Sequence, residues 1–266
     1  MLGLLRSEHA DATHSLGPGD APLADAGSGV TATFPKIEGY RILGVLGQGG
    51  MGVVFQGEQQ HPRRTVALKV LRSGIVSPEL LRRFEKEAQV LGRLHHVGIA
   101  HIYEGGTADG GHGLQPYLAM ELIHGLPLTD YCEAHELSTK KRLELLTKVC
   151  DAIEHAHQNN VIHRDLKPEN VFLTVQGGIQ DFPKVLDFGL AKVTERQMRP
   201  GSLILTQEGM VFGTPEFMSP EQVRGEPASA ATDVYALGVV LYEMLTGQLP
   251  YDLDGLGLLQ VVETIQ

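Results

Sequence analysis

Tryptophan is absent from this chain of 266 residues, and cysteine occurs only at Cys132 and Cys150. Two cysteines make no disulfide framework and lack the spacing of a metal site, so the sequence predicts a reducing, cytoplasmic setting. Long apolar runs are also lacking. Residues 1–5 are too short for a signal peptide, and the most apolar later stretch, residues 236–245, is about half of a membrane span. No membrane segment is therefore expected, although a longer chain could carry an anchor beyond residue 266.

Basic residues are scarce, with 22 Lys and Arg against 32 Asp and Glu and a formal net charge of -10. Because proteins hold nucleic acids and anionic membranes through Lys and Arg, this balance argues against both as partners. Residues 1–36 contain few large apolar side chains and three prolines. Such a segment buries too little apolar surface to offset its ordering entropy, so a disordered tail is predicted.

The remainder of the chain changes from short apolar strands to helical periodicity. Strands are predicted at 40–46, 53–59, 65–71, 99–104 and 116–122, with a helix at 78–94 and a flexible loop at 105–113. Helices follow at 128–134, 138–159 and 232–245, and a hairpin is expected at 174–183. The apolar spacing of Leu143, Leu146, Val149, Ile153 and Ala156 predicts the core-facing side of the second of these helices. The pattern predicts an α+β protein with two lobes.

Two short motifs carry most of the chemical information. The segment HRDLKPEN at 163–170 places an acid, a lysine and an amide on one loop, and DFG follows at 187–189. Phosphoryl transfer needs this set: a carboxylate for the incoming hydroxyl, a cation for the γ-phosphate and oxygen ligands for magnesium. DFG alone is a weak signal, and it becomes informative only because HRDLKPEN precedes it.

Two further motifs precede them in the order expected for phosphoryl transfer from a nucleotide. GQGGMGVV at 47–54 fits the pattern G-x-G-x-x-G-x-V, and VALK ends at Lys69. The glycines also fit a dinucleotide-binding fingerprint, but that needs a helix directly after them, and here a strand is predicted. With all four motifs, the chain resembles a serine/threonine protein kinase of the bacterial, Hanks-type branch, from about Tyr40 to the last residue.

The resemblance implies a bilobal kinase domain at 37–266, with a small antiparallel β lobe at 37–122 and a mainly helical lobe at 123–266. In the family the helical lobe continues beyond the point matched by Gln266, so a shortened lobe is expected. The implied cofactors are ATP and Mg²⁺, with Mn²⁺ as an alternative. The residues expected around the nucleotide are Leu46, Gly47, Gly49, Gly50, Gly52, Val54, Ala67, Lys69, Met120, Glu121, Ile123 and Phe172.

The resemblance also assigns catalytic roles. Lys69 is expected to bind the α- and β-phosphates while paired with Glu87 on the following helix, for which Glu85 is the competing candidate. Asp165 is expected to accept the proton of the substrate hydroxyl, and Lys167 to neutralise the γ-phosphoryl oxygens. The metal ligands are expected to be Asn170 and Asp187.

Positions in and around the activation segment, which GTPEFMSPE closes at 213–221, are expected to regulate the enzyme. Arg164 precedes the catalytic aspartate, and its guanidinium suits a bidentate phosphate. Thr206 is the leading candidate for autophosphorylation, ahead of Thr194 and Ser202, and Glu208 is hypothesised to supply part of that charge permanently; an ordinary loop glutamate is the alternative. Thr214 is expected to shape the acceptor site beside Asp165.

Two more positions are expected to support the loop of residues 163–170, which is the catalytic loop by resemblance to the family. Asp233 resembles the helix-start aspartate that braces this loop in the family. His163 is expected to lie in the core against Phe188.

The function predicted from the sequence is transfer of the γ-phosphoryl group of MgATP to serine and threonine hydroxyls of proteins, including the chain's own activation segment. A kinase–kinase dimer for trans-autophosphorylation is a further expectation. The alternatives are a catalytically inactive kinase-fold fragment or a nucleotide-binding regulatory module. A pseudokinase would be expected to have lost Lys69, Asp165, Asn170 or Asp187, and all four are present. A small-molecule kinase would lack the segment GTPEFMSPE at 213–221.

Overall fold

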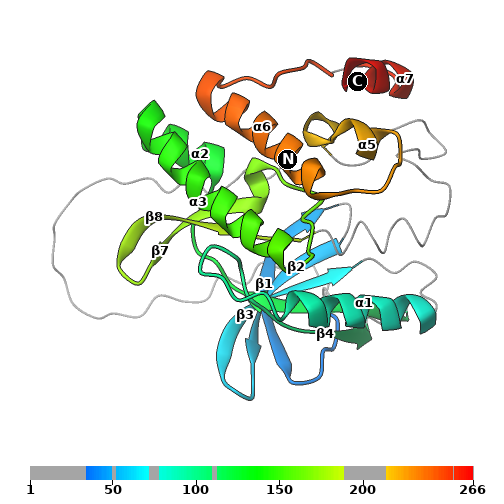
Figure 1. Ribbon diagram of the computed structural model, residues 1–266. Coiled ribbons are helices and arrows are strands. Elements are labelled where there is room, and N and C mark those ends of the chain that lie inside the picture. The colour runs from blue at the N-terminus through cyan, green and yellow to red at the C-terminus, as the bar shows by residue number, and fades with distance from the viewer. Residues whose placement is uncertain are drawn as a thin grey trace, which may run out of the picture.

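Alternating apolar residues build a five-stranded antiparallel sheet in the first half of the chain (Figure 1). The computed structural model describes residues 34–49, 52–71, 78–109, 113–188, 214–253 and 255–265. The strand order is β1-β2-β3-β5-β4. The bounds are Tyr40–Gly49 for β1, Gly52–Gln59 for β2, Arg64–Leu71 for β3, Ile102–Asp109 for β4 and Leu114–Glu121 for β5.

The two faces of this sheet are covered differently. On β3, Val66, Leu68 and Val70 face an apolar cluster that also holds Phe55 and Tyr117. The alternate residues face the helix α1, Pro78–Leu91, because successive side chains of a strand point to opposite faces. Lys69 is on this second face, between two apolar neighbours of the main core, so the strand period directs it into the molecule. The helix meets that face with Phe84, Ala88 and Leu91.

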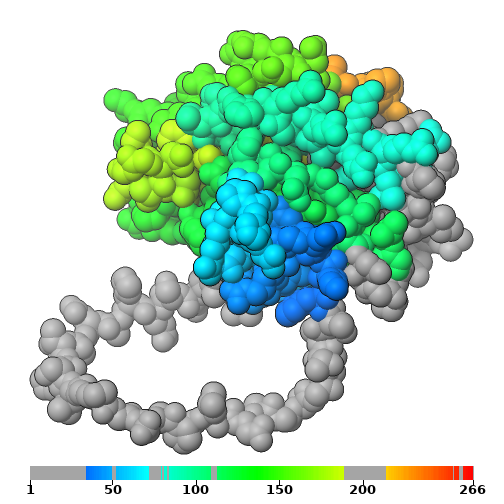
Figure 2. All heavy atoms as spheres, turned by 90° about the horizontal axis from the view of Figure 1, so that it is seen from below, coloured from blue at the N-terminus to red at the C-terminus, as the bar shows by residue number. Residues whose placement is uncertain are grey.

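The second half of the chain forms the helical lobe. Its helices are α2 (Leu128–Ala134), α3 (Thr139–Gln158), α5 (Pro220–Val223), α6 (Ala230–Thr246) and α7 (Leu258–Ile265). Two short 3-10 helices, η1 (Pro168–Asn170) and η2 (Pro215–Phe217), and a sheet of β6 (Leu126–Pro127), β7 (Val171–Gln176) and β8 (Ile179–Val185) complete the described lobe. In Figure 1 these helices lie on one side of the five-stranded sheet, and Figure 2 looks from below, with the blue and cyan β1–β3 in front.

Backbone hydrogen bonds join the two lobes behind the site. The segment that precedes β4 lies along β8, with a parallel bridge between Ile99 and Val185. The amide of Ala100 donates to the Val185 carbonyl at 2.9 Å, and the Val185 amide donates to the Gly98 carbonyl at 2.8 Å. The end of β8, which leads to Asp187, is therefore fixed against the small lobe.

The predicted strands and helices are confirmed in kind and order, as is the hairpin, with boundary shifts of a few residues. One prediction is wrong: residues 105–109, expected in a flexible loop, extend β4 and pair with β5. Glycine has a low propensity for strands, but pairing with β5 supplies the backbone hydrogen bonds that hold Gly105 and Gly106 in β4. Leu143 was expected in the core and is 43 % exposed, because the buried stripe of α3 runs through Leu145 and Leu146 instead. Among the described residues, no helix is long and apolar enough to span a membrane.

Candidate active site

An ion pair joins the small lobe to the segment after β8. The Lys69 ammonium lies 2.8 Å from a carboxylate oxygen of Asp187, and the side chains are 14 % and 30 % exposed. Asp187 has a left-handed backbone, with φ of 56°, a conformation that costs a non-glycine residue energy and is concentrated at functional sites. The two charges predicted to contact phosphate and metal are thus adjacent in the structure.

The glycine-rich turn lies between β1 and β2. Gly47, Gly49 and Gly52 are at the facing ends of these strands, and Gly49 pairs with Gly52. A β-carbon on Gly52 would lie 2.1 Å from the Val70 carbonyl oxygen, whereas one on Gly49 would meet no atom within 4 Å. The sheet itself therefore requires glycine at 52, and space remains open at 49. Gly50 lies outside the described residues.

Three of the side chains expected around the base of the nucleotide lie on the neighbouring strands β2, β3 and β5. Val54 is directly opposite Lys69 on the neighbouring strand, and Ala67 is opposite Met120. Ala67 and Met120 are each 7 % exposed and belong to one apolar cluster, against which Val54 packs. Of the other expected residues, Glu121, Ile123 and Phe172 are partly buried, and Leu46 is 45 % exposed.

The two candidate glutamates of α1 differ in burial. Glu87 is partly buried and follows Phe84 by three residues, whereas Glu85 is exposed. Side chains three or four apart share a helix face, so Glu87 lies with the residues that face the sheet. The structure thus favours Glu87 over Glu85 in position, and its pairing with Lys69 stays a prediction.

The catalytic loop is ordered around His163, whose side chain is fully buried. The Nε2 nitrogen lies 2.8 Å from the Leu186 carbonyl oxygen, and Nδ1 accepts the Asp165 amide at 3.2 Å. Burial lowers the pKa of His163, which keeps the ring neutral and fits a single tautomer with hydrogen on Nε2. The ring also contacts Phe188 with centroids 4.6 Å apart, which confirms its predicted core position.

Asn170 is held beside Asp165. Its amide nitrogen donates to the Asp165 carbonyl at 2.7 Å and approaches Oδ2 of the same residue at 3.3 Å. The amide of Leu186 donates to the Asn170 carbonyl at 2.8 Å, so Asn170 is tied to the residue directly before Asp187. These contacts bring the end of the segment 163–170 next to the start of the DFG motif. They use the side-chain nitrogen of Asn170, so its side-chain oxygen is the group that could bind a cation.

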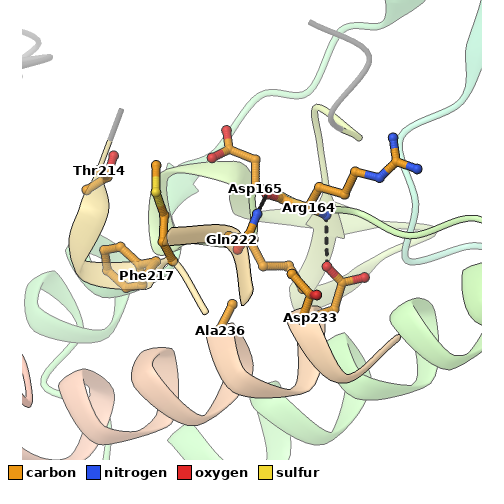
Figure 3. Close-up of a pocket in the computed structure, with 10 residues that line it drawn as sticks. Arg164, Asp165, Thr214, Phe217, Gln222, Asp233 and Ala236 are labelled. Carbon is orange, nitrogen blue, oxygen red and sulfur yellow. Dashed lines mark hydrogen bonds between the residues drawn. The ribbon is translucent and has the colours of Figure 1, made fainter. Parts of the chain in front are cut away.

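Asp233, near the start of α6, anchors the loop from below (Figure 3). The side chain is 1 % exposed, and its carboxylate accepts the His163 amide at 2.7 Å and the Arg164 amide at 2.8 Å. The Nε2 nitrogen of His157 lies 2.7 Å away. The bracing role predicted for Asp233 is confirmed, and Figure 3 shows the Asp165 carboxylate pointing away from α6.

Gln222 makes a second contact with the loop that the sequence motifs did not predict. Its Nε2 donates to the Arg164 carbonyl at 2.8 Å, while its Oε1 accepts the Ser219 amide at 3.1 Å in a capping box. The pattern of Ser219 followed three residues later by Gln could have revealed the cap. The bond to a residue 58 positions earlier could not have been found this way, because it depends on the tertiary arrangement.

Lys167 and Arg164 of the same loop differ in their contacts. The Lys167 ammonium donates to the Thr214 hydroxyl at 2.9 Å, which connects the catalytic loop to the residue before η2. Arg164 has φ of 67°, and its Nε is buried with no hydrogen-bond partner among the described residues. Thr206 and Glu208 lie outside the described residues. A pocket between the loop, η2 and α6 is lined by Arg164, Asp165, Leu166, Thr214, Phe217, Met218, Gln222, Thr232, Asp233 and Ala236 (Figure 3).

The oxygen atoms of Asn170 and Asp187 fit a hard divalent cation as ligands. The carboxylate of Asp187 and the amide oxygen of Asn170 are oxygen ligands of the kind that Mg²⁺ prefers, and the backbone ties described above hold their segments together. Such a cation keeps several positions for phosphate and water oxygens, so two protein ligands are sufficient.

Comparisons with known proteins identify the family. Residues 40–261 match the family model of the protein kinase domain. The chain is 39 % identical over 218 residues to the serine/threonine-protein kinase Pkn1 of Myxococcus xanthus, covering 82 % of this chain and 30 % of Pkn1. It is 40 % identical over 215 residues to PrkC of Bacillus subtilis, covering 80 % of this chain and 31 % of PrkC. The chain therefore belongs to the protein kinase family, in its bacterial Hanks-type serine/threonine branch.

The solved structures agree with the fold. The crystal structure of the Mycobacterium tuberculosis PknI kinase domain superposes with a TM-score of 0.64 at 28 % identity, over 85 % of this chain and 82 % of that one. The bilobal kinase fold predicted from the sequence is confirmed. Membership of the family implies ATP, a divalent cation and protein substrates in general terms. The chain spans about a third of the length of the curated relatives named above.

Proposed function

We propose that this chain is the catalytic domain of a protein kinase that transfers the γ-phosphoryl group of MgATP to serine and threonine hydroxyls of proteins. The base of ATP would lie between Val54, Ala67 and Phe172, with the backbone of residues 121–123 at its edge. Lys69 would bind the α- and β-phosphates. Asn170 and Asp187 would hold Mg²⁺, or Mn²⁺ in its place, and the bound cation would neutralise charge on the phosphates.

The chemistry proposed for the catalytic loop is an in-line displacement. The substrate hydroxyl oxygen forms a bond to the γ-phosphorus as the bond to the β-phosphate oxygen breaks, and ADP leaves. The hydroxyl proton passes to the Asp165 carboxylate. Because His163 and Asn170 hold the backbone and one oxygen of Asp165, its orientation is set before substrate arrives, and positioning supplies most of the catalysis.

The observation that carries this proposal is the hydrogen bond between Lys167 and Thr214. It joins the ammonium of Lys167, two residues after Asp165, to the hydroxyl of Thr214, which lines the same pocket as Asp165. In support of the proposal, Lys167 would there neutralise the transferred phosphoryl group, and Thr214 would line the path of a serine or threonine side chain. A kinase acting on small molecules would need no such link to the end of an activation segment.

Incubation of the purified chain with MgATP, followed by intact-mass measurement, tests the proposal. The native chain is expected to gain phosphate, and Asp187→Asn is expected to gain none because it lacks the metal carboxylate. Transfer to an added generic substrate, such as dephosphorylated casein, is expected in parallel. Binding of MgATP without any transfer would instead support the regulatory-module alternative.

The regulatory roles follow from the same site. Arg164 would bind a phosphate on Thr206, and its buried Nε, which has no hydrogen-bond partner among the described residues, supports this role. Glu208 would supply part of that negative charge. Peptide mapping of the phosphorylated chain tests Thr206, and an unchanged rate in Glu208→Gln would remove the role of Glu208.

The remaining proposals concern partners and setting. Phosphorylation between two copies of the chain would explain how the segment is first modified, and a dependence of its rate on protein concentration tests this. The two free cysteines, Cys132 and Cys150, support a reducing, cytoplasmic setting for this domain.

A further inference from the structure

Glu121 and Lys184 form an enclosed ion pair behind the nucleotide site. The Lys184 ammonium lies 2.9 Å from Oε1 and 2.8 Å from Oε2 of Glu121. The Lys184 side chain is 5 % exposed and that of Glu121 is 24 % exposed. A third hydrogen bond reaches the same carboxylate, from the amide of His101 at 3.1 Å. Glu121 is thus held by two segments that are far apart in the sequence.

The positions of the pair along the chain connect the two ends of the proposed nucleotide site. Glu121 is the last residue of β5 and directly follows Met120, at the start of the segment proposed to meet the base. Lys184 is on β8, three residues before Asp187, and pairs across the sheet with Phe172. The ion pair therefore joins the base end of the proposed site to the strand that leads to Asp187, the proposed metal ligand.

Backbone hydrogen bonds connect the end of β5 to β8 only through residues 98–101 in the described part of the chain. The Glu121 amide donates to the His101 carbonyl at 2.8 Å, and Ala100 and Val185 are joined as described above. Residues 98–101 thus lie between the end of β5 and β8 and are bonded to both. Among the described residues, no backbone hydrogen bond joins Glu121 directly to β8, and the Lys184 side chain makes that connection.

Stability alone gives a weak reason for this arrangement. Removing two charges from water is costly, and replacing a buried ion pair with apolar residues of similar size is often neutral or stabilising. A buried lysine that meets a carboxylate through two short bonds instead fixes the separation of two backbone segments, because changing that separation would take the buried Lys184 ammonium away from its carboxylate.

We propose that Glu121 and Lys184 are a positioning pair that sets the distance of residues 121–123 from Asp187, so that the base and the phosphates of one nucleotide can be bound at the same time. The inference rests on the proposed function, since it assumes a nucleotide that spans both ends. Its consequence is specific: ligands that contact both ends depend on the pair, and a ligand that contacts the base end alone does not.

The experiment compares ADP with adenosine by calorimetry on the native chain, Lys184→Met and Glu121→Gln. Each variant is expected to weaken ADP binding about tenfold and adenosine binding less than about twofold. The KM for ATP should rise in parallel with little change in kcat, because ground-state and transition-state binding are lost equally. Lys184→Arg, which keeps the charge, should recover part of the affinity for ADP.

Two further variants keep the test interpretable. The double variant Glu121→Gln/Lys184→Met removes both charges without stranding either, so it should fold even if a single variant does not, and it should show the same selective loss for ADP. Lys141→Met removes the cation of an exposed ion pair on α3 and should change neither affinity.

Equal weakening of ADP and adenosine, or a lower melting temperature with unchanged affinities, would overturn the positioning role and leave the pair as a packing feature. If the native chain bound neither ligand, the proposed function itself would fail, and the inference with it. Normal binding without phosphoryl transfer would overturn only the proposed catalysis.

Discussion

Lys69 and Asp187 are 118 residues apart in the sequence (187 − 69), and their charged groups are 2.8 Å apart in the structure. Lys69 is carried by the central strand of the small lobe, and Asp187 follows a strand of the helical lobe. The contact between the two lobes therefore assembles the site, and neither lobe contains it alone.

Replacing Lys69 should abolish catalysis without unfolding the protein. Lys69→Met removes the cation proposed for the phosphates and leaves Asp187 partly exposed, where water can solvate it. The initial rate of phosphoryl transfer should fall at least ~100-fold, with a small change in melting temperature. Lys86→Met, at an exposed position of α1, is the matched control and should retain the native rate. A near-native rate in Lys69→Met would contradict the assigned role.

Asp233→Asn should destabilise the chain and disorder the catalytic loop. The buried carboxylate accepts two backbone amides and contacts His157, and an asparagine would turn an NH₂ group toward at least one donor. We expect a loss of about 3 kcal/mol in the free energy of unfolding, measured with urea, and a large loss of activity. His157→Gln retains a donor and should cost less; a larger loss than for Asp233→Asn would refute this account.

Gln222→Glu should remove the support of the catalytic loop and keep the cap. Glutamate can still accept the Ser219 amide, but it cannot donate to the Arg164 carbonyl. The variant should therefore have a lower kcat, and it should lose stability because its carboxylate is buried, whereas Gln222→Ala should lose about 1 kcal/mol of stability with the cap. Steady-state kinetics and urea unfolding of both variants provide the measurement. Native kcat in Gln222→Glu would show that the bond to Arg164 has no catalytic consequence.

Glu243 should make stability depend on pH. Burial, with Glu169 and Glu133 contributing, raises the pKa of Glu243 from 4.5 to about 6, and its Oε2 has no hydrogen-bond partner among the described residues. Because the folded-state pKa is the higher one, the stability contributed by the protonated form is complete below pH 4.5 and is lost as pH rises through about 6.

Glu243→Gln should therefore be more stable than the native chain at about pH 8, by on the order of 1 kcal/mol after allowance for solvent screening, and the difference should vanish below about pH 4.5. Thermal unfolding as a function of pH measures it. Glu154→Gln, an exposed change on α3, is the control and should give the same pH profile as the native chain. A constant difference at every pH would show that titration of Glu243 is not the cause.

The sequence predicted the elements of this fold because their local signals are strong. Strand alternation located β1, β2 and β3 within three residues at each end, and helical spacing located α2 and α3. It failed for residues 105–109, where glycines and polar residues favour a loop locally, and β5 supplies the pairing that makes them a strand. It also misplaced Leu143, because Leu143 is three residues before Leu146 and so fits the helical spacing, although the buried face at that point includes Leu145 instead.

The sequence by itself determined which chemical groups the candidate site offers, because two aspartates, an asparagine amide, two lysines and a glycine-rich turn occur in motifs whose order and residue types are specific. Only the tertiary structure decided which groups meet: Lys69 with Asp187, Lys167 with Thr214, and Asp233 with the amides of residues 163 and 164. The contacts of Gln222 and Lys184 with distant backbone and side-chain groups have no local signature. The physical reason is that a motif fixes the kind of donor or acceptor available, whereas the packing of the two lobes fixes the distance between partners.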